Sequence, residues 1–290
     1  VMDKGDIYEA EYEGLYSVSE ERFITEKEAE SGEFRDIKQL KEKNYFFKMS
    51  KYQQALIDHI KSNPKFIQPN NRKNEILGFL RQPLNDLCIS RPKSRLNWGI
   101  ELPFDSDYVT YVWFDALINY ITAPGFGRDE ESFNRWWPAS YHLIGKDILT
   151  THAVYWPTML MSAGIELPKT IFAHGWWLMG ESKMSKSLGN VINPMDLIDD
   201  YGVDPVRYYL MREMVLGQDS SFTMESFIQR YNSDLANDFG NLLSRVSTLM
   251  KKNFDGKIPE PGDFTEAEAV IKSNGESLGE VVKEKIEAMR

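Results

Sequence analysis

The pattern of apolar and polar positions changes character twice along the chain. Residues 1–35 alternate apolar and polar side chains over short stretches rich in acids, which favours a small β-hairpin module. Two helices are expected next. The first has apolar residues four apart, begins at a cap on Ser50 and stops at Pro64, and the second ends at Pro83.

A regular alternation of strands and helices begins near residue 106. Asn193 and Asp204 each precede a proline, which is typical of a capping side chain before the first helical position. Strands that alternate with helices indicate a parallel sheet with right-handed crossovers, whose ligands bind beyond the carboxyl ends of the strands. Apolar runs predict strands over residues 108–114, 141–144 and 170–173, a short helix from Asp115 and a longer helix over about 148–161.

A third pattern starts at residue 224, where apolar residues recur every three or four positions, as on one long amphipathic helix. An acidic, helix-like segment then runs to Arg290. The pattern predicts three segments, residues 1–105, 106–223 and 224–290, and the helical domain that opens the last segment is expected to be cut short.

Composition narrows the class of protein. The 290 residues are 42% apolar and 27% charged, which is typical of a soluble globular protein and excludes disordered, collagen-like and membrane-bundle chains. No apolar run approaches ~18 residues and the first residues have no signal-peptide pattern, so we expect no membrane partner and a cytoplasmic location. The net charge of −10 argues mildly against a polyanion partner, although binding needs only a local basic patch.

Cysteine and histidine content predicts no metal site. Cys88 is the single cysteine, so an internal disulfide and a thiolate cluster are excluded, and a small buried residue is expected there. The four histidines show no paired spacing, and zinc needs closed sets of cysteine or histidine ligands. We therefore predict that the protein binds no zinc.

The most specific local motif follows the third predicted strand. Lys183 and Lys186 lie three residues apart among serines that include Ser185, between Gly180 and Gly189. Glycine and serine favour a mobile loop, and two ammonium groups with nearby hydroxyls suit one anion such as polyphosphate. Such charges stabilise the charge that develops when a phosphoryl group is transferred. An isolated pair of lysines at this spacing would more often belong to an ordinary solvated loop.

Residues 183–187 match in full the KMSKS signature of class I aminoacyl-tRNA synthetases. Within that class the chain resembles methionyl-tRNA synthetase. The resemblance implies the second half of a Rossmann-type α/β catalytic domain, preceded by part of a connective insertion and followed by the start of an α-helical anticodon-binding domain. The supporting segments are YVWFDALINY (111–120), IGKDILTTHAVYWPTML (144–160), HGWWLMGESKMSKSLGN (174–190), YGVDPVRYYLMRE (201–213), and LNDLCISRP with WGIELP within residues 84–103.

The resemblance also assigns residues to two substrates. Lys183 and Lys186 become catalytic residues that act on the ATP phosphates. The set assigned to ATP comprises Lys183, Ser185, Lys186, Gly145, Asp147 and His174, where His174 is equally well explained as an ordinary strand end. The set assigned to methionine comprises Trp113, Ala116, Tyr120, His152 and Trp156.

General chemistry is compatible with the methionine set. A thioether packs well against aromatic rings, and His152 and Trp156 are four residues apart, so they share a helix face. Trp113 is expected at the carboxyl end of a strand. On pattern alone both tryptophans are more often core residues, and a lone histidine is more often a hydrogen-bonded core residue.

Three further residues stay open at this point. By resemblance Arg91 reaches back toward the active site, but a surface ion pair explains it equally well. Trp176 and Trp177 would face opposite ways if both lay on a strand, and at least one of them is expected to be packing.

Two departures from the family pattern limit the expectation. The HIGH signature is absent, so the resemblance implies that the half of the enzyme that carries HIGH lies outside this chain, and that the chain alone does not activate methionine. Ser17 and Glu20 stand where many family members have the first cysteine pair of a zinc knuckle.

The expected function is methionine–tRNA ligase activity. The enzyme would use ATP and Mg²⁺ to convert L-methionine to methionyl-adenylate and then transfer it to tRNA(Met), with the missing N-terminal half supplied in cis or in trans. Two alternatives remain: another class I synthetase for an aliphatic amino acid, or a non-catalytic tRNA-binding or interaction fragment.

Overall fold

The computed structural model describes residues 1–17, 22–24, 29–30, 36–180, 182–184, 189 and 191–287. Glu20, Ser185 and Lys186 lie outside the described residues. The chain divides into two compact units, residues 1–173 and 174–290. The domain boundaries expected at residues 105 and 223 stay predictions.

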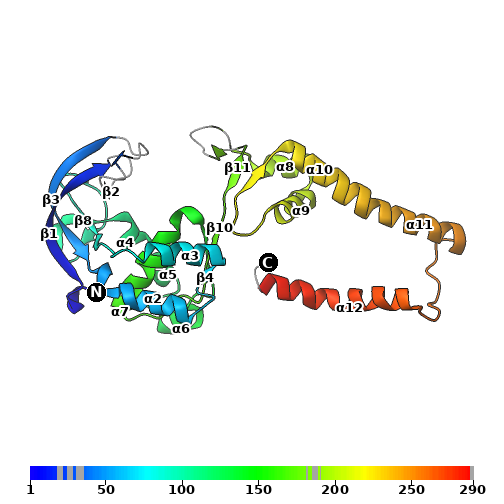
Figure 1. The fold of residues 1–290 in the computed structure, drawn as a ribbon, viewed down its shortest axis with the longest axis horizontal. Helices are drawn as coiled ribbons and strands as arrows, with labels where there is room; N and C mark the ends of the chain where they lie inside the picture. Colours follow the sequence, from blue (N-terminus) through cyan, green and yellow to red (C-terminus); the bar gives the residue numbers. More distant parts are fainter. Residues whose placement is uncertain are drawn as a thin grey trace. The chain divides into compact units, whose positions relative to one another are not determined.

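The first unit opens with an antiparallel sheet of long strands (Figure 1). β1 (Ile7–Ser17) pairs with β3 (Ile37–Phe47) along its whole length, and the sheet order is β2-β1-β3-β5 with the short strands β2 (Arg22–Ile24) and β5 (Leu87–Cys88). The predicted β-structure is therefore present. The main partner of β1 lies beyond residue 35, so the module is larger than the sequence pattern indicated.

Two helices follow the sheet, as predicted, but the expected cap on Ser50 is wrong. A 3₁₀ turn (Met49–Tyr52) precedes α2 (Gln53–Ser62), and α3 is Asn70–Phe79. The Ser50 hydroxyl donates instead to Oδ1 of Asp86 at 2.6 Å. A tertiary acceptor thus binds the side chain that was expected to cap the helix.

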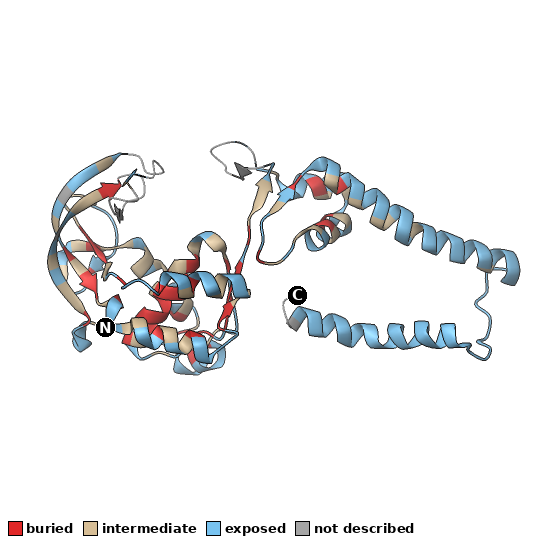
Figure 2. Ribbon diagram, viewed as in Figure 1, coloured by how far each residue is buried: buried red, intermediate tan, exposed pale blue. Residues whose placement is uncertain are grey.

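A short sheet forms the centre of the first unit. β4 (Ile67–Gln68) runs parallel to β10 (Ile171–His174), and β9 (His142–Gly145) lies on the other side of β10. β9 and β10 are the predicted second and third strands. The predicted helix between them is present as a π-helical segment (Thr151–Tyr155) that continues into α7 (Trp156–Ala163). Figure 2 shows buried residues concentrated on α7 and β10.

The strand predicted over residues 108–114 is wrong in its second half. β8 (Asp105–Thr110) ends earlier and is antiparallel to β6 (Ser90–Pro92) and β7 (Glu101–Leu102), outside the parallel sheet. α4 (Val112–Ala116) then begins before Asp115, and α5 (Asn119–Thr122) and α6 (Glu130–Trp136) follow. The backbone amide of Asp115 donates to the Tyr111 carbonyl oxygen at 3.2 Å, which is the i to i−4 bond of a helix.

The second unit contains another three-stranded sheet. β11 (Trp177–Met179) lies between β12 (Ser182–Lys183), which is antiparallel to it, and β13 (Ser220–Phe222), which is parallel. Gly175 enters this sheet at a point of close backbone approach. A Cβ atom there would lie 2.0 Å from the carbonyl oxygen of Gln218, so only glycine fits.

α8 (Pro194–Tyr201) and α9 (Val203–Glu213) pack beside this sheet around a small apolar cluster. The cap predicted on Asn193 is confirmed, because its side chain accepts from the Met195 amide at 3.1 Å. The cap predicted on Asp204 is wrong, because α9 already begins at Val203 and Asp204 lies in its first turn. Gly202, with a φ of 86°, makes the break between the two helices.

The predicted long helix is confirmed in the second unit. α10 (Met224–Arg230), a π-helical segment (Tyr231–Gly240) and α11 (Asn241–Phe254) follow one another in helical conformation, and α12 is Glu266–Glu287. Figure 2 shows α11 and α12 exposed along their length. Among the described residues, no helix is both long and apolar enough to cross a membrane.

A buried carboxylate joins the start of the first strand to two helical segments. Asp6 is 1% exposed and accepts hydrogen bonds from Lys51 Nζ at 2.6 Å, from Ser162 Oγ at 2.8 Å and from the Tyr52 hydroxyl. Burial opposes the charge of Asp6, but these three hydrogen bonds outweigh it and lower the pKa of the carboxyl to about 2.

Asp6→Asn should lower the free energy of unfolding by about 2–4 kcal/mol at pH 7, because an uncharged amide faces at least one donor in a buried site. Urea denaturation of the chain measures this, with the exposed Asp3→Asn as the matched control. The contribution of the Asp6 charge to the free energy of unfolding should be complete above pH 3.8 and disappear as the pH falls through about 2. Equal stability of the two variants would contradict the role of Asp6.

Candidate active site

A tyrosine–histidine pair marks the centre of the residues assigned to methionine. The Tyr120 hydroxyl on α5 lies 3.0 Å from Nε2 of His152, and Nδ1 of His152 lies 2.9 Å from the Ile148 carbonyl oxygen. A carbonyl oxygen can only accept, so Nδ1 of His152 carries the proton. Nε2 is then the acceptor, and Tyr120 donates to it.

The π-helical segment Thr151–Tyr155 presents His152 to the site. Such segments add a residue to the helical turn and occur often at functional sites. Both His152 and Trp156 face Tyr120, with ring centroids 5.6 and 6.1 Å from it, so the shared face expected from their spacing is present.

Trp113 and Ala116 both lie on α4. The Trp113 ring meets His152 edge to face at 6.5 Å. Trp113, Ala116 and Tyr120 are half-buried, so they keep accessible surface next to the buried His152. The structure therefore brings Trp113 and Tyr120 together around His152, although Trp113 stands in a helix rather than at a strand end.

Trp156 is more deeply buried than Trp113, Ala116 and Tyr120 of the set assigned to methionine. It is 1% exposed, its ring packs against Tyr120 and Trp137, and its indole N–H donates to Nε2 of His142 at 3.2 Å. It therefore stands behind Tyr120 in this arrangement. Its assignment to methionine stays a prediction.

The two buried histidines are held neutral. Burial lowers the pKa of His152, against a smaller opposite effect of the Ile148 carbonyl. Burial, with the nearby His152, lowers the pKa of His142 to about 4. Burial also raises the pKa of the Tyr120 hydroxyl. Tyr120 and His152 are therefore both uncharged at neutral pH, and they form hydrogen bonds without a fixed charge.

Part of the ATP set lies close to this cluster in sequence. Gly145 ends β9 and is half-buried, and Asp147 is exposed in the 3₁₀ turn Lys146–Ile148 that follows. The same turn supplies the Ile148 carbonyl that binds His152. The end of β9 and the turn after it thus carry the two residues assigned to adenosine. The same turn carries the carbonyl group that orients His152.

The second unit carries the other part of the ATP set. His174 is exposed at the end of β10, and its Nδ1–H donates to the Gly175 carbonyl at 2.7 Å. Lys183 lies in β12 and pairs with Leu178 of β11. Ser185 and Lys186 are outside the described residues, so their assignment rests on the motif alone.

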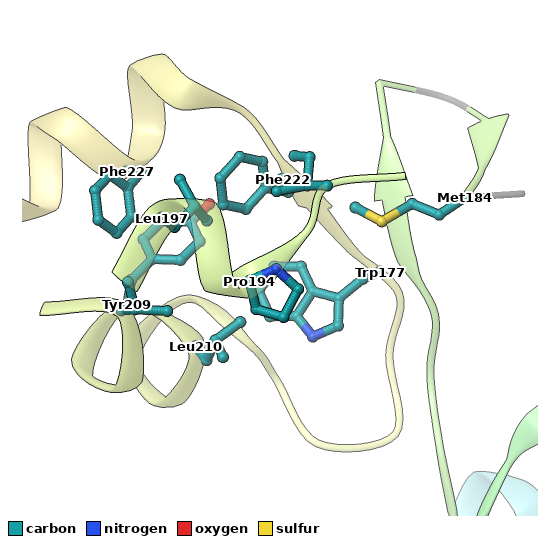
Figure 3. A pocket seen from close by; sticks show the side chains of 10 residues that line it. Trp177, Met184, Pro194, Leu197, Tyr209, Leu210, Phe222 and Phe227 are labelled. Atoms are coloured by element: carbon teal, nitrogen blue, oxygen red, sulfur yellow. The ribbon is translucent and has the colours of Figure 1, made fainter. Parts of the chain in front are cut away.

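An apolar cavity of about 250 Å³ lies beside β11 in the second unit (Figure 3). Met184, the residue after Lys183, extends from the strand end toward this cavity and is half-buried. Trp177 also lines the cavity and packs 6.0 Å from Tyr209, which agrees with the expectation that at least one of the paired tryptophans is packing.

Arg91 is not a surface residue. It is buried, donates to the Ser90 carbonyl at 2.7 Å and packs over the Tyr111 ring at 4.6 Å. Tyr111 is the N-cap residue of the helix that carries Trp113, so Arg91 contacts the support of the site. Cys88 is half-buried, and burial raises the pKa of its thiol.

Comparison with known proteins identifies the family. Residues 31–247 match the family model described as tRNA synthetases class I (M). The chain belongs to the class I tRNA synthetases (M).

Several relatives of this family are similar along nearly the whole chain. The methionine–tRNA ligase of Clostridium acetobutylicum is 49% identical over 294 residues, covering 99% of this chain and 45% of that protein. That of Fusobacterium nucleatum is 50% identical over 291 residues, covering 98% and 45%. The chain therefore spans about half the length of these curated relatives.

A solved structure agrees with the fold. The Mycobacterium tuberculosis methionyl-tRNA synthetase in complex with methionyl-adenylate superposes with a TM-score of 0.87 at 45% identity, covering 99% of this chain and 58% of that one. The α/β fold with a parallel sheet expected for a class I synthetase is thus confirmed.

Two residues of the cluster were missed by the sequence analysis of this class I synthetase chain. His142 binds Trp156 and contacts Tyr120, and Ile148 supplies the acceptor for His152. The alternation on β9 could have indicated His142, since it lies two residues before the apolar Ile144. Nothing in the sequence singled out a backbone carbonyl.

The neutral state of His142 predicts a pH-dependent stability. Its pKa is about 4 when folded against 6.5 for an ordinary histidine, so the unfolded chain binds the proton more tightly. Stability should be complete above pH 6.5 and fall as the pH drops toward about 4. Tyr120 and His152 are the titratable groups that contact His142.

Urea denaturation of the chain at pH 7 and pH 4.5 tests this prediction against His142→Gln, which removes the titrating group. Between these pH values the wild type should lose about 2 kcal/mol more than the variant. Carboxylates titrate in both proteins and cancel in the comparison. Equal losses would show that His142 is not held neutral.

Proposed function

We propose that the protein containing this chain is a methionine–tRNA ligase. In the first step the methionine carboxylate oxygen attacks the α-phosphorus of ATP, the bond to the β-phosphate oxygen breaks, and methionyl-adenylate and pyrophosphate form. In the second step a ribose hydroxyl of the terminal adenosine of tRNA(Met) attacks the methionyl carbonyl, and AMP leaves. No protein nucleophile is required, so catalysis is positioning plus stabilisation of charge.

The observation that carries the proposal is the convergence of Trp113, Tyr120 and His152 in one partly accessible cluster. Its walls are aromatic and its polar groups are neutral, which suits an unbranched thioether. The relatives named for methionine and the neighbour bound to methionyl-adenylate support the same substrate.

The remaining residues have proposed roles on the nucleotide. Gly145 and Asp147 would contact the adenosine side of ATP, and Lys183 and Lys186, with Ser185, the phosphates. His174 would also contact ATP. Among the described residues no group of three or more His, Cys, Asp or Glu side chains could hold a metal ion. Mg²⁺ is proposed to arrive bound to ATP.

The proposal includes parts that lie outside this chain. The half of the catalytic domain that carries the HIGH signature would complete the ATP site, in cis or in trans. Within the chain, we propose residues 1–105 as part of the connective insertion, 106–223 as the second catalytic half and 224–290 as the start of the anticodon-binding domain. We propose a cytoplasmic location, where tRNA and ATP are both available.

Lys186→Ala in the full-length protein should lower the rate of adenylate formation by about 100- to 1000-fold, because the ammonium group acts mainly when phosphate charge redistributes. The KM for methionine should change little. Methionine-dependent ATP–pyrophosphate exchange measures both constants, with the exposed Lys61→Ala on α2 as a control. A mutant that loses methionine affinity and keeps its rate would contradict the phosphate role.

Substrate selectivity distinguishes methionine from branched amino acids. Trp113→Ala and Trp156→Ala should strongly reduce the use of methionine and reduce that of leucine or norleucine less, because shape rather than hydrogen bonding excludes the wrong side chain. A misfit of one methylene is worth about 10- to 200-fold in such pockets. His152→Ala should cost less than either tryptophan variant, because Ile148 and Tyr120 already occupy both ring nitrogens and no N–H is left for the sulfur.

The measurement is the ratio of kcat/KM for methionine to that for leucine in the three variants of the full-length protein. An unchanged ratio in both tryptophan variants would assign these residues to the core. The proposal of a methionine-specific pocket would then lose its physical support.

A further inference from the structure

His142 is a buried polar residue that none of the proposed steps uses. It is the first residue of β9 and 4% exposed, and its backbone N–H donates to the Thr170 carbonyl at 2.8 Å. Its neighbour Leu143 is 64% exposed, whereas Ile144 is buried, so the strand turns His142 and Ile144 into the core. A histidine at such a position needs a polar partner.

The side chain of His142 contacts two members of the methionine set at once. Its Nε2 accepts the indole N–H of Trp156 at 3.2 Å, a bond between two buried side chains. Its ring lies 4.2 Å from the ring of Tyr120, which is the shortest separation between aromatic rings among the described residues. The Tyr120 hydroxyl in turn donates to His152.

These contacts fix the state of His142. An indole N–H can only donate, so Nε2 of His142 must lack a proton. A protonated imidazole would place an N–H against the indole N–H and a positive charge next to His152, whose ring lies 6.3 Å away. The neutral form is the one compatible with the packing.

We propose that His142 is a positioning residue for methionine recognition, because its Nε2 holds the Trp156 indole in place against the ring of Tyr120. This inference rests on the proposed function. Its effect is indirect: Trp156 and Tyr120 pack against each other at 6.1 Å, so a turn of the indole removes the support from the tyrosine ring. The tyrosine hydroxyl would then leave Nε2 of His152, and the shape of the pocket would change.

Two substitutions separate the hydrogen bond from the ring packing. His142→Phe keeps a flat ring under Tyr120 but removes the acceptor, which leaves the buried indole N–H of Trp156 without its partner. His142→Gln keeps an amide oxygen at about the position of Nε2 but removes the ring. His59→Gln on α2 serves as a histidine control outside the cluster.

The test uses the full-length protein and methionine-dependent ATP–pyrophosphate exchange. His142→Phe should raise the KM for methionine by about ten-fold or more with a smaller change in kcat and in the KM for ATP, while His142→Gln should stay within about three-fold of wild type. The indole N–H resonance of Trp156, assigned with Trp156→Phe, should shift in the phenylalanine variant and stay near its place in the glutamine variant. Equal KM values for wild type and His142→Phe, or equal effects of both substitutions, would overturn the inference.

A double-mutant cycle keeps the inference testable if His142→Phe is poorly folded alone. In the Trp156→Phe background the acceptor has no donor to serve, so His142→Phe should add less than about three-fold to the KM for methionine. Full additivity would overturn the inference. Absence of methionine-dependent exchange in the wild-type protein would instead overturn the proposed function, and the indole resonance would still report on the hydrogen bond.

Discussion

One neutral imidazole, that of His152, links two elements of the candidate site. His152 is 2% exposed and must satisfy two ring nitrogens without bulk water, and it does so with the Ile148 carbonyl on one side and the Tyr120 hydroxyl on the other. Because a buried polar group without a partner costs free energy, both partners are constrained to stay in place. The turn after β9 and the helix α5 are thereby joined through a single side chain.

The layers around His152 follow from that constraint. Tyr120 turns its hydroxyl inward, so its ring becomes part of a wall whose back is formed by Trp156 and His142. Trp113 and Ala116 keep accessible surface on the neighbouring helix. An aromatic wall with neutral polar groups behind it offers shape and polarisability rather than charge, which suits the thioether of the proposed substrate.

The second unit is organised around an apolar cavity beside its short sheet. Its sheet presents Lys183 on a short strand, and the next residue, Met184, packs toward an apolar cavity beside Trp177. The Cα atom of Lys183 lies only ~3.8 Å from that of Met184. The hydrophobic contact of Met184 is therefore directly next to the lysine in the chain. A small cluster that includes Tyr209 and Phe227 connects this cavity to α9 and to the start of the long helix.

Features with a strong local or linear signal were predictable from the amino-acid pattern alone. The spacing of apolar residues predicts the strands β9 and β10, the helix between them and the long helix from Met224. Capping chemistry predicts the cap on Asn193. The motif at residues 183–187 and its companion segments identified the family, because a five-residue string is specific without knowledge of its geometry.

Features that depend on distant partners could not be predicted and became apparent in the folded chain. Asp86 binds the Ser50 hydroxyl that was expected to cap a helix, and the chain becomes helical at Val112, within the predicted strand, to form the helix that carries Trp113. The role of His142 depends on a donor fourteen residues away and on a ring in another helix. Sequence patterns report the period of one element, whereas hydrogen bonds between buried side chains are decided by which elements pack together.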